Sequence, residues 1–215
     1  LKAMPLVPEA ESTAQAANLF VAATAEKLKG RASANMVTLR GFSSIPVLPN
    51  MRDVYRLTPA AIAAYPMYKG ISSLVGMKVL DTGDSFDDEM DTFEKHFSDH
   101  DFLFLHYKPA DTAGEDGDFE AKVAALEALD NQIPRLLALD PDVLVIAGDH
   151  STPAIMAAHS WHPVPFLVHS SITVGQGVAS FSERDFNLGS IGRISATDIM
   201  ITALAHAGKL RKFGP

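Results

Sequence analysis

Short runs of mainly apolar residues alternate with longer stretches in which apolar residues recur every three or four positions. The short runs are typical of buried strands, and they lie at 36–39, 78–80, 102–105, 143–147 and 165–168. The run at 143–147 carries no charge, which is typical of a buried parallel strand. Strands that alternate with helices predict an α/β fold with a mainly parallel sheet flanked by helices.

The stretches between the runs predict amphipathic helices. Before Gly30 one such helix places Leu19, Phe20 and Leu28 on a common face. Thr58-Pro59 offers an N-cap followed by proline at the first helical position, so we expect a helix there that Pro66 interrupts. The remaining predicted helices are 67–75, a Phe/Met-faced helix at 86–97, a helix at 119–137 interrupted near Pro134, and a last helix from Ser195 to Gly208.

Composition narrows the class of protein. A chain of 215 residues with 47% hydrophobic side chains can bury a good core. No apolar run reaches the roughly 20 residues of a membrane span and no signal-peptide pattern is visible, so a soluble cytoplasmic protein is predicted. The net charge of −8 argues against a nucleic-acid or anionic membrane partner. With no cysteine, any metal must be held by oxygen and imidazole.

Candidate chemistry follows the run at 143–147. The run stops at Gly148, and Asp149 and His150 come directly after it, with His159 nearby in sequence. The carboxyl ends of parallel strands are where α/β sheets bind ligands, and a loop can turn these side chains onto one cation. The alternative is a capping aspartate beside a hydrogen-bonded histidine.

A second polar stretch follows the run at 102–105 and reinforces the first. His106 and Lys108 are joined there by four carboxylates, those of Asp111, Glu115, Asp116 and Asp118. Mutual repulsion among so many acids in a loop is costly unless a cation or solvent relieves it. A cation site is therefore predicted, and a solvated acidic loop that caps the next helix is the alternative.

Two basic residues are candidates for contact with an anionic ligand. Arg40 follows the run at 36–39 and precedes a glycine, which leaves it free to face a ligand. Lys69 lies near the start of a predicted helix, where backbone amides already favour an anion.

Several blocks in order resemble the archaeal-type cofactor-independent phosphoglycerate mutases of the alkaline phosphatase superfamily. The blocks are Leu39-Arg40-Gly41, Phe102 through Asp118, Gly148 through Pro153, Ala158 through Pro165, and Asn187 through Arg193. The resemblance implies an alkaline-phosphatase-like fold and an enzyme that interconverts 3-phosphoglycerate and 2-phosphoglycerate through a phosphoserine. It also implies two divalent ions, manganese or magnesium with zinc as the alternative, and a small phosphorylated substrate.

The resemblance also implies roles for single residues. Asp149 and His150 would bind the ion that activates the serine, and Asp111, Glu115 and His159 would bind the other ion. Arg40 and Lys69 look like contacts to the substrate's carboxylate or phosphate.

Three departures from the family pattern qualify this assignment. Glu115 stands where the pattern has a histidine, which favours harder ions over zinc, and His162 stands where an aspartate is usual. The nucleophilic serine is expected upstream of Leu1, and Ser151 is not assigned that role. On this basis residues 1–34 are expected to end an inserted cap domain, and residues 35–215 to form the C-terminal part of the phosphatase-like core.

Two other functions remain open at this point. A phosphatase or phosphodiesterase of the same superfamily differs only in letting water resolve the phosphoserine. A non-catalytic metal-binding domain that keeps the fold is the third interpretation. The oligomeric state cannot be read from the sequence.

Overall fold

The computed structural model describes residues 2–173 and 177–210 and divides the chain into two compact units, Leu1–Val47 and Leu48–Pro215. The first unit contains the short 3₁₀ helix η1 (Pro8–Ala10) and the predicted helix, α1 (Glu11–Leu28). Gly30 has a φ of 97°, which suits glycine just beyond a helix end. The predicted strand at 36–39 is wrong, because these residues form no strand and are mostly exposed. The predicted domain boundary at 34/35 stays a prediction.

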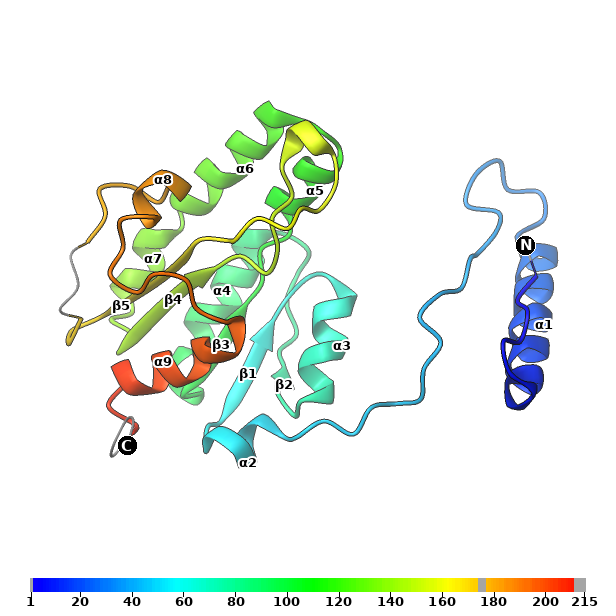
Figure 1. Cartoon of the computed structure of the whole chain (residues 1–215), viewed down its shortest axis with the longest axis horizontal. Helices are drawn as coiled ribbons and strands as arrows, with labels where there is room; N and C mark the ends of the chain where they lie inside the picture. Colours follow the sequence, from blue (N-terminus) through cyan, green and yellow to red (C-terminus); the bar gives the residue numbers. More distant parts are fainter. Residues whose placement is uncertain (1, 174–176, 211–215) are drawn as a thin grey trace. The chain divides into compact units, whose positions relative to one another are not determined.

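A three-stranded parallel sheet forms the core of the second unit. Its central strand is β1 (Pro59–Ile62), which pairs with β2 (Lys78–Val79) on one side and with β3 (Phe102–Leu105) on the other. The strands predicted near 78 and at 102–105 are thereby confirmed. Figure 1 shows β1 between its two neighbours. The side chains of Ala60, Ala61 and Ile62 on this strand are fully buried.

The helix predicted to start at Thr58-Pro59 is wrong, because this segment forms β1. Ala60, Ala61 and Ile62 are all 0% exposed, and their backbone groups are bonded to strands on both sides. Burial and two rows of hydrogen bonds outweigh a local helix-start pattern, which is only a weak preference. Pro66 likewise begins a helix rather than interrupting one, because α3 (Pro66–Leu74) accepts proline at its first position.

The helices that precede the candidate site along the chain include one that was predicted from the spacing of its apolar residues. The short α2 (Met51–Tyr55) precedes β1, and α4 (Phe86–His96) continues into the 3₁₀ helix η2 (Phe97–Asp99). Ser85 and Asp88 form a reciprocal capping box at the start of α4. Met90 is 0% exposed, which confirms that the Phe/Met face of this helix belongs to the core.

After β3 the acidic stretch forms mainly a helix rather than a loop. It contains α5 (Pro109–Glu115), followed by α6 (Phe119–Asp130) and α7 (Ile133–Ala138). Proline at the first position of α5 starts that helix, and the Asp118 carboxylate caps α6 by accepting from the Ala121 amide at 2.9 Å. The predicted interruption near Pro134 is confirmed by the break between α6 and α7.

The last strands form a separate antiparallel pair. The strands are β4 (Val143–Ala147) and β5 (Phe166–Ser170), and only the 3₁₀ helix η3 (Ala154–Met156) lies between them. The prediction of a parallel strand at 143–147 is therefore wrong. A parallel neighbour needs a crossover connection, usually a helix, and this connection makes no such crossover. The chain continues with α8 (Glu183–Phe186), η4 (Ala196–Asp198) and α9 (Ile199–His206).

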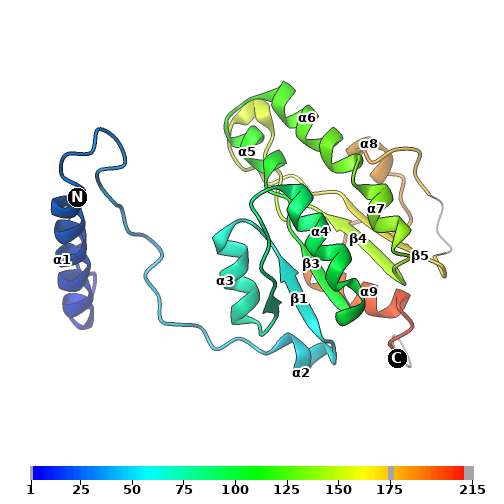
Figure 2. The ribbon, with the colours of Figure 1, turned by 180° about the vertical axis from the view of Figure 1, so that it is seen from behind.

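Helices cover the strands on both sides, which confirms the α/β class. Figure 2 shows α4, α6 and α7 in front of the strands, and Figure 1 shows α9 on the opposite side. Among the described residues, no helix is both long enough and apolar enough to cross a bilayer. The turns that follow β3 and β4 come together at one end of this layer, where the predicted ligands lie.

A buried acid joins α4 to the sheet. Glu89 is only 3% exposed, and its Oε1 accepts a hydrogen bond from the Ala64 amide at 2.5 Å, just beyond β1. Burial raises the pKa of Glu89 to about 7, although the Ala64 amide and the charge of Lys69 act in the opposite direction. The protonated form is therefore the one that the fold favours.

We expect Glu89 to make stability depend on pH between about 4.5 and 7. A carboxyl whose pKa is raised on folding stabilises the fold at low pH, and this contribution is lost as the pH rises through the folded pKa. Relative to Glu89→Gln, the unaltered chain should lose about 2–3 kcal/mol of unfolding free energy across this window. Urea unfolding of the unaltered chain and of Glu89→Gln at pH 5 and 7.5 measures this loss. Glu120→Gln, at an exposed position of α6, is the control. The prediction is contradicted if the unfolding free energies of the unaltered chain and of Glu89→Gln differ by the same amount at both pH values.

Candidate metal centre

Two loops meet beyond the end of β4. Ser151 and Ser160 form an antiparallel bridge, in which the Ser160 amide donates to the Ser151 carbonyl at 2.8 Å. Because alternate residues of an extended segment share a face, the bridge directs His150 and His159 to the same side. Their rings lie 3.9 Å apart between centroids. Two imidazoles that are nine positions apart in sequence thus become neighbours.

Asp111 on α5 completes the cluster. One ligand atom from each of Asp111, His150 and His159 lies within 4.8 Å of the others. Asp111 Oδ1 is 3.8 Å from His150 Nδ1 and 3.7 Å from His159 Nε2. The side chain of Asp111 is 18% exposed, whereas that of His159 is 54% exposed, so the cluster is closed on the α5 side and open to solvent on the other.

Asp111 is held in its ionised form. Burial acts against its charge, but hydrogen bonds from Lys108 and Thr152 outweigh that effect and keep the pKa of Asp111 below its usual range. Thr152 Oγ1 donates to Asp111 Oδ1 at 2.6 Å. The Asp111 hydrogen bond in turn raises the pKa of Lys108. An anionic oxygen therefore faces two imidazoles.

Asp149 is held by Tyr68, a residue for which the sequence predicts no role. The Tyr68 hydroxyl on α3 donates to Asp149 Oδ2. Burial opposes ionisation of Asp149, but this hydrogen bond and His150 bring the pKa below its usual range. The Tyr68 ring is stacked on His106 at 3.6 Å, and burial followed by the hydrogen bond to Asp149 raises the pKa of Tyr68. Only its position beside Lys69 could have drawn attention to Tyr68.

The other predicted residues are placed differently. Glu115 lies at the rim of the cluster, with Oε1 at 3.3 Å from His159 Nε2 and Oε2 at 3.9 Å from Lys108 Nζ. Lys69 lies on α3 next to Tyr68, and its charge acts on Glu89. Arg40 belongs to the first unit and is exposed. His162 stacks on Trp161 and bonds the Ser160 hydroxyl at 2.9 Å, outside the cluster.

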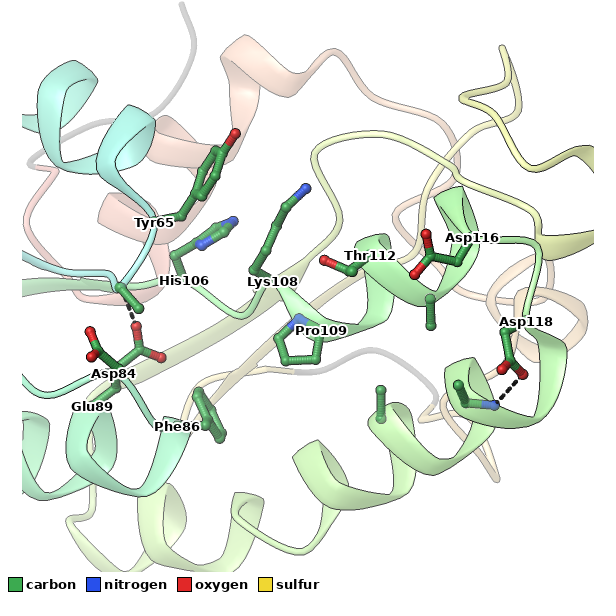
Figure 3. Close-up of a pocket in the computed structure, with 14 residues that line it drawn as sticks. Tyr65, Asp84, Phe86, Glu89, His106, Lys108, Pro109, Thr112, Asp116 and Asp118 are labelled. Atoms are coloured by element: carbon green, nitrogen blue, oxygen red, sulfur yellow. Dashed lines mark hydrogen bonds between the residues drawn. The ribbon is translucent and has the colours of Figure 1, made fainter. Parts of the chain in front are cut away.

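A cavity of about 510 Å³ opens beside Lys108. Its polar lining comes from α4, from the turn between β3 and α5, and from α5, and includes Glu89, His106 and Lys108, with Tyr65 at one edge (Figure 3). The Lys108 ammonium lies 5.2 Å from the centre of the Tyr65 ring. Because the same ammonium bonds Asp111, the cavity and the cluster share one cationic side chain.

The chemistry of the donor set fits a divalent cation. One ionised carboxylate and two imidazoles converge, and a second carboxylate oxygen, Asp149 Oδ2, lies 3.5 Å from His150 Nε2. Nitrogen and oxygen ligands in this number suit manganese or zinc, and carboxylates also suit magnesium. The fold and this site define an α/β protein with a candidate metal-binding cluster beyond the ends of β3 and β4.

Comparison with known proteins places the chain more narrowly. Residues 8–206 match the Metalloenzyme superfamily, and the chain belongs to that family. It is 47% identical over 204 residues to a probable 2,3-bisphosphoglycerate-independent phosphoglycerate mutase of Thermotoga neapolitana, which covers 95% of this chain and 51% of the relative. A Thermus thermophilus protein with the same description is 45% identical, over 100% of this chain and 53% of its own length. The chain thus spans about half the length of the curated relatives it matches.

Solved structures agree with the fold. The PH0037 protein from Pyrococcus horikoshii superposes with a TM-score of 0.74 at 28% identity, covering 79% of this chain and 55% of that one. The cofactor-independent phosphoglycerate mutase from Thermoplasma acidophilum gives a TM-score of 0.64 at 21% identity, covering 95% and 55%. The alkaline-phosphatase-like fold predicted from the sequence is confirmed.

We expect Gly114 on α5 to be required for the close approach of Thr152. A Cβ at Gly114 would overlap the Thr152 carbonyl oxygen and lie 2.9 Å from Lys122 Nζ. Gly114→Ala should lower the unfolding free energy by about 1–3 kcal/mol, as overpacking does.

Urea unfolding measures this loss, and Gly70→Ala on α3 is the matched control. Nothing lies within 4 Å of a Cβ at Gly70, so alanine there should raise stability by about 0.5–1 kcal/mol through helix propensity. Equal stabilisation by both alanines contradicts the proposed crowding.

Proposed function

We propose that this chain is the metal-binding part of a cofactor-independent phosphoglycerate mutase, which interconverts 3-phosphoglycerate and 2-phosphoglycerate through a phosphoserine. The observation that carries the proposal is the convergence of Asp111, His150 and His159 beyond the ends of β3 and β4. It occurs in a chain that is 44–47% identical to relatives described as probable mutases of this kind. A glycolytic role in the cytoplasm and a small phosphorylated substrate are parts of the same proposal.

The predicted division of ligands follows neighbouring side chains, and His150, which also lies 3.8 Å from Asp111, stands at the border between the two proposed ion sites. Asp149 and His150 would hold one divalent ion, and Asp149 Oδ2 lies 3.5 Å from His150 Nε2. Asp111, Glu115 and His159 would hold the other, since His159 Nε2 lies 3.7 Å from Asp111 and 3.3 Å from Glu115. Bound manganese or magnesium, with zinc as the alternative, would polarise phosphoryl oxygens.

Basic residues would bind the substrate's negative charges. Lys69 is proposed for this role because α3 also presents Tyr68 to Asp149, which places the helix beside the predicted centre. Arg40 is proposed on the family pattern alone. No serine of this chain is assigned as the nucleophile, and the Ser151 backbone serves to join the two loops.

A hydrolase of the same superfamily is the second candidate, and the openness of the site favours it. The side chains of Asp149 and His159 are 55% and 54% exposed in this chain, so water reaches both. Water that enters such a site resolves a phosphoserine by hydrolysis, whereas a mutase must exclude it.

Substitution of single ligands should weaken metal binding. We expect Asp149→Asn and His159→Ala each to reduce manganese affinity by more than about 10-fold, because even outer-shell partners of a metal contribute 10–100-fold. Isothermal titration of the 215-residue chain measures the affinity, and His162→Ala serves as the control because His162 lies outside the cluster. Unchanged affinity in both variants shows that the ligand assignment is wrong.

The reaction itself is tested on the full-length protein that contains this chain. With manganese and 3-phosphoglycerate supplied, we expect isomerisation in an enolase-coupled assay and little phosphate in the same samples. Loss of both signals in Asp149→Asn would tie the reaction to this centre. Phosphate release without isomerisation would instead identify a hydrolase, because the metal-assisted step is common to both reactions.

A further inference from the structure

Thr152 lies between the two proposed sets of metal ligands, Asp149 with His150 and Asp111 with Glu115 and His159. It is 3% exposed, and its hydroxyl contacts a ligand from each set. Oγ1 is 2.6 Å from Asp111 Oδ1 and 3.0 Å from His150 Nδ1. A buried hydroxyl that joins two predicted ligands has the position of an outer-shell partner.

The direction of these hydrogen bonds follows from the chemistry of the partners. Asp111 is paired with Lys108 and, as a carboxylate, can only accept, so the single Thr152 proton points to Asp111. Thr152 Oγ1 must then accept from His150 Nδ1–H. In the neutral imidazole Nε2 therefore carries the lone pair, and it faces Asp149 Oδ2 at 3.5 Å. Two acceptors at this separation form an arrangement that a cation completes.

The backbone around Thr152 fixes the position of the hydroxyl. Its carbonyl accepts a hydrogen bond from Lys122 Nζ on α6 at 2.7 Å. Gly114 on α5 approaches so closely that a Cβ there would overlap the same carbonyl. Contacts with two helices thus fix the backbone of Thr152, and its β-branched side chain has few accessible rotamers.

We propose that Thr152 is a positioning residue, whose hydroxyl relays a hydrogen bond from His150 Nδ1 to Asp111 Oδ1 and so orients one ligand of each proposed metal ion. This inference rests on the proposed function. The relay fixes the His150 tautomer, turns Nε2 toward Asp149, and links the two ion sites through one side chain. Removal of the hydroxyl should affect both sites together.

The first test compares two substitutions of Thr152 by isothermal titration of the 215-residue chain with manganese. Thr152→Val keeps the shape and removes the relay, and we expect an affinity about 10–100-fold weaker. Thr152→Ser keeps the hydroxyl and should stay within about threefold of the unaltered chain, since the outer-shell contact remains. Thr92→Val on α4 is the matched control, because it removes the partly buried hydrogen bond from the Thr92 hydroxyl to Thr82, and neither residue belongs to the proposed metal centre.

The second test determines the tautomer of His150 in the metal-free chain. Long-range ¹H–¹⁵N spectra of the histidine rings, with His150→Gln to assign the signal, should show His150 protonated at Nδ1 in the unaltered chain and in Thr152→Ser. Thr152→Val should lose this preference. Urea unfolding of each variant shows whether it is folded.

The outcomes separate this inference from the proposed function. An Nε2–H tautomer in the unaltered chain, or a valine variant with unchanged tautomer and unchanged affinity, overturns the relay. A Thr152-dependent tautomer in a chain that binds no manganese supports the relay and contradicts the proposed metal function. A serine variant as weak as the valine variant also counts against the relay, because it would make the methyl group the feature that matters.

Discussion

The charge of Asp111 is the constraint on which the rest of the site depends. A partly buried carboxylate is stable only when donors or cations surround it, and here Lys108 and Thr152 donate hydrogen bonds to it. Lys108 directly precedes α5 and Thr152 lies in the loop after β4, next to the bridge at Ser151, so satisfying one charge joins α5 to that loop. The same charge is what makes the cluster suitable for a divalent cation.

The parallel sheet of β2, β1 and β3 leads into the segments that carry the site. β1 is enclosed between β2 and β3, and its buried backbone leads to Ala64, where Glu89 accepts a hydrogen bond at the base of the cavity. β3 leads directly to His106 and α5. The site is therefore carried on the buried parallel sheet of the second unit, while the open side is formed by loops. Such a division between a rigid base and exposed ligands is common where α/β sheets bind their ligands.

A second polar chain approaches the centre from α3. Tyr68 stacks on His106 and bonds Asp149, which connects the helix carrying Lys69 to a predicted metal ligand. Substrate contact and metal support would thus come from adjacent residues of one helix. Since the chain spans about half of its relatives' length, the remaining parts of a complete active site belong to the longer protein in our proposal.

The sequence by itself determined the α/β class, most helices from their periodicity, and which residue types could bind a metal, because these depend on local spacing and chemistry. It failed at Thr58-Pro59, where pairing on both sides and complete burial override a local cap, and at β4, whose antiparallel partner depends on the path of the chain. It also missed Tyr68 and left Thr152 without a role, because their importance comes from contacts with residues 81 and 41 positions away. Tertiary structure alone decided those contacts, since only packing brings distant side chains within hydrogen-bonding distance.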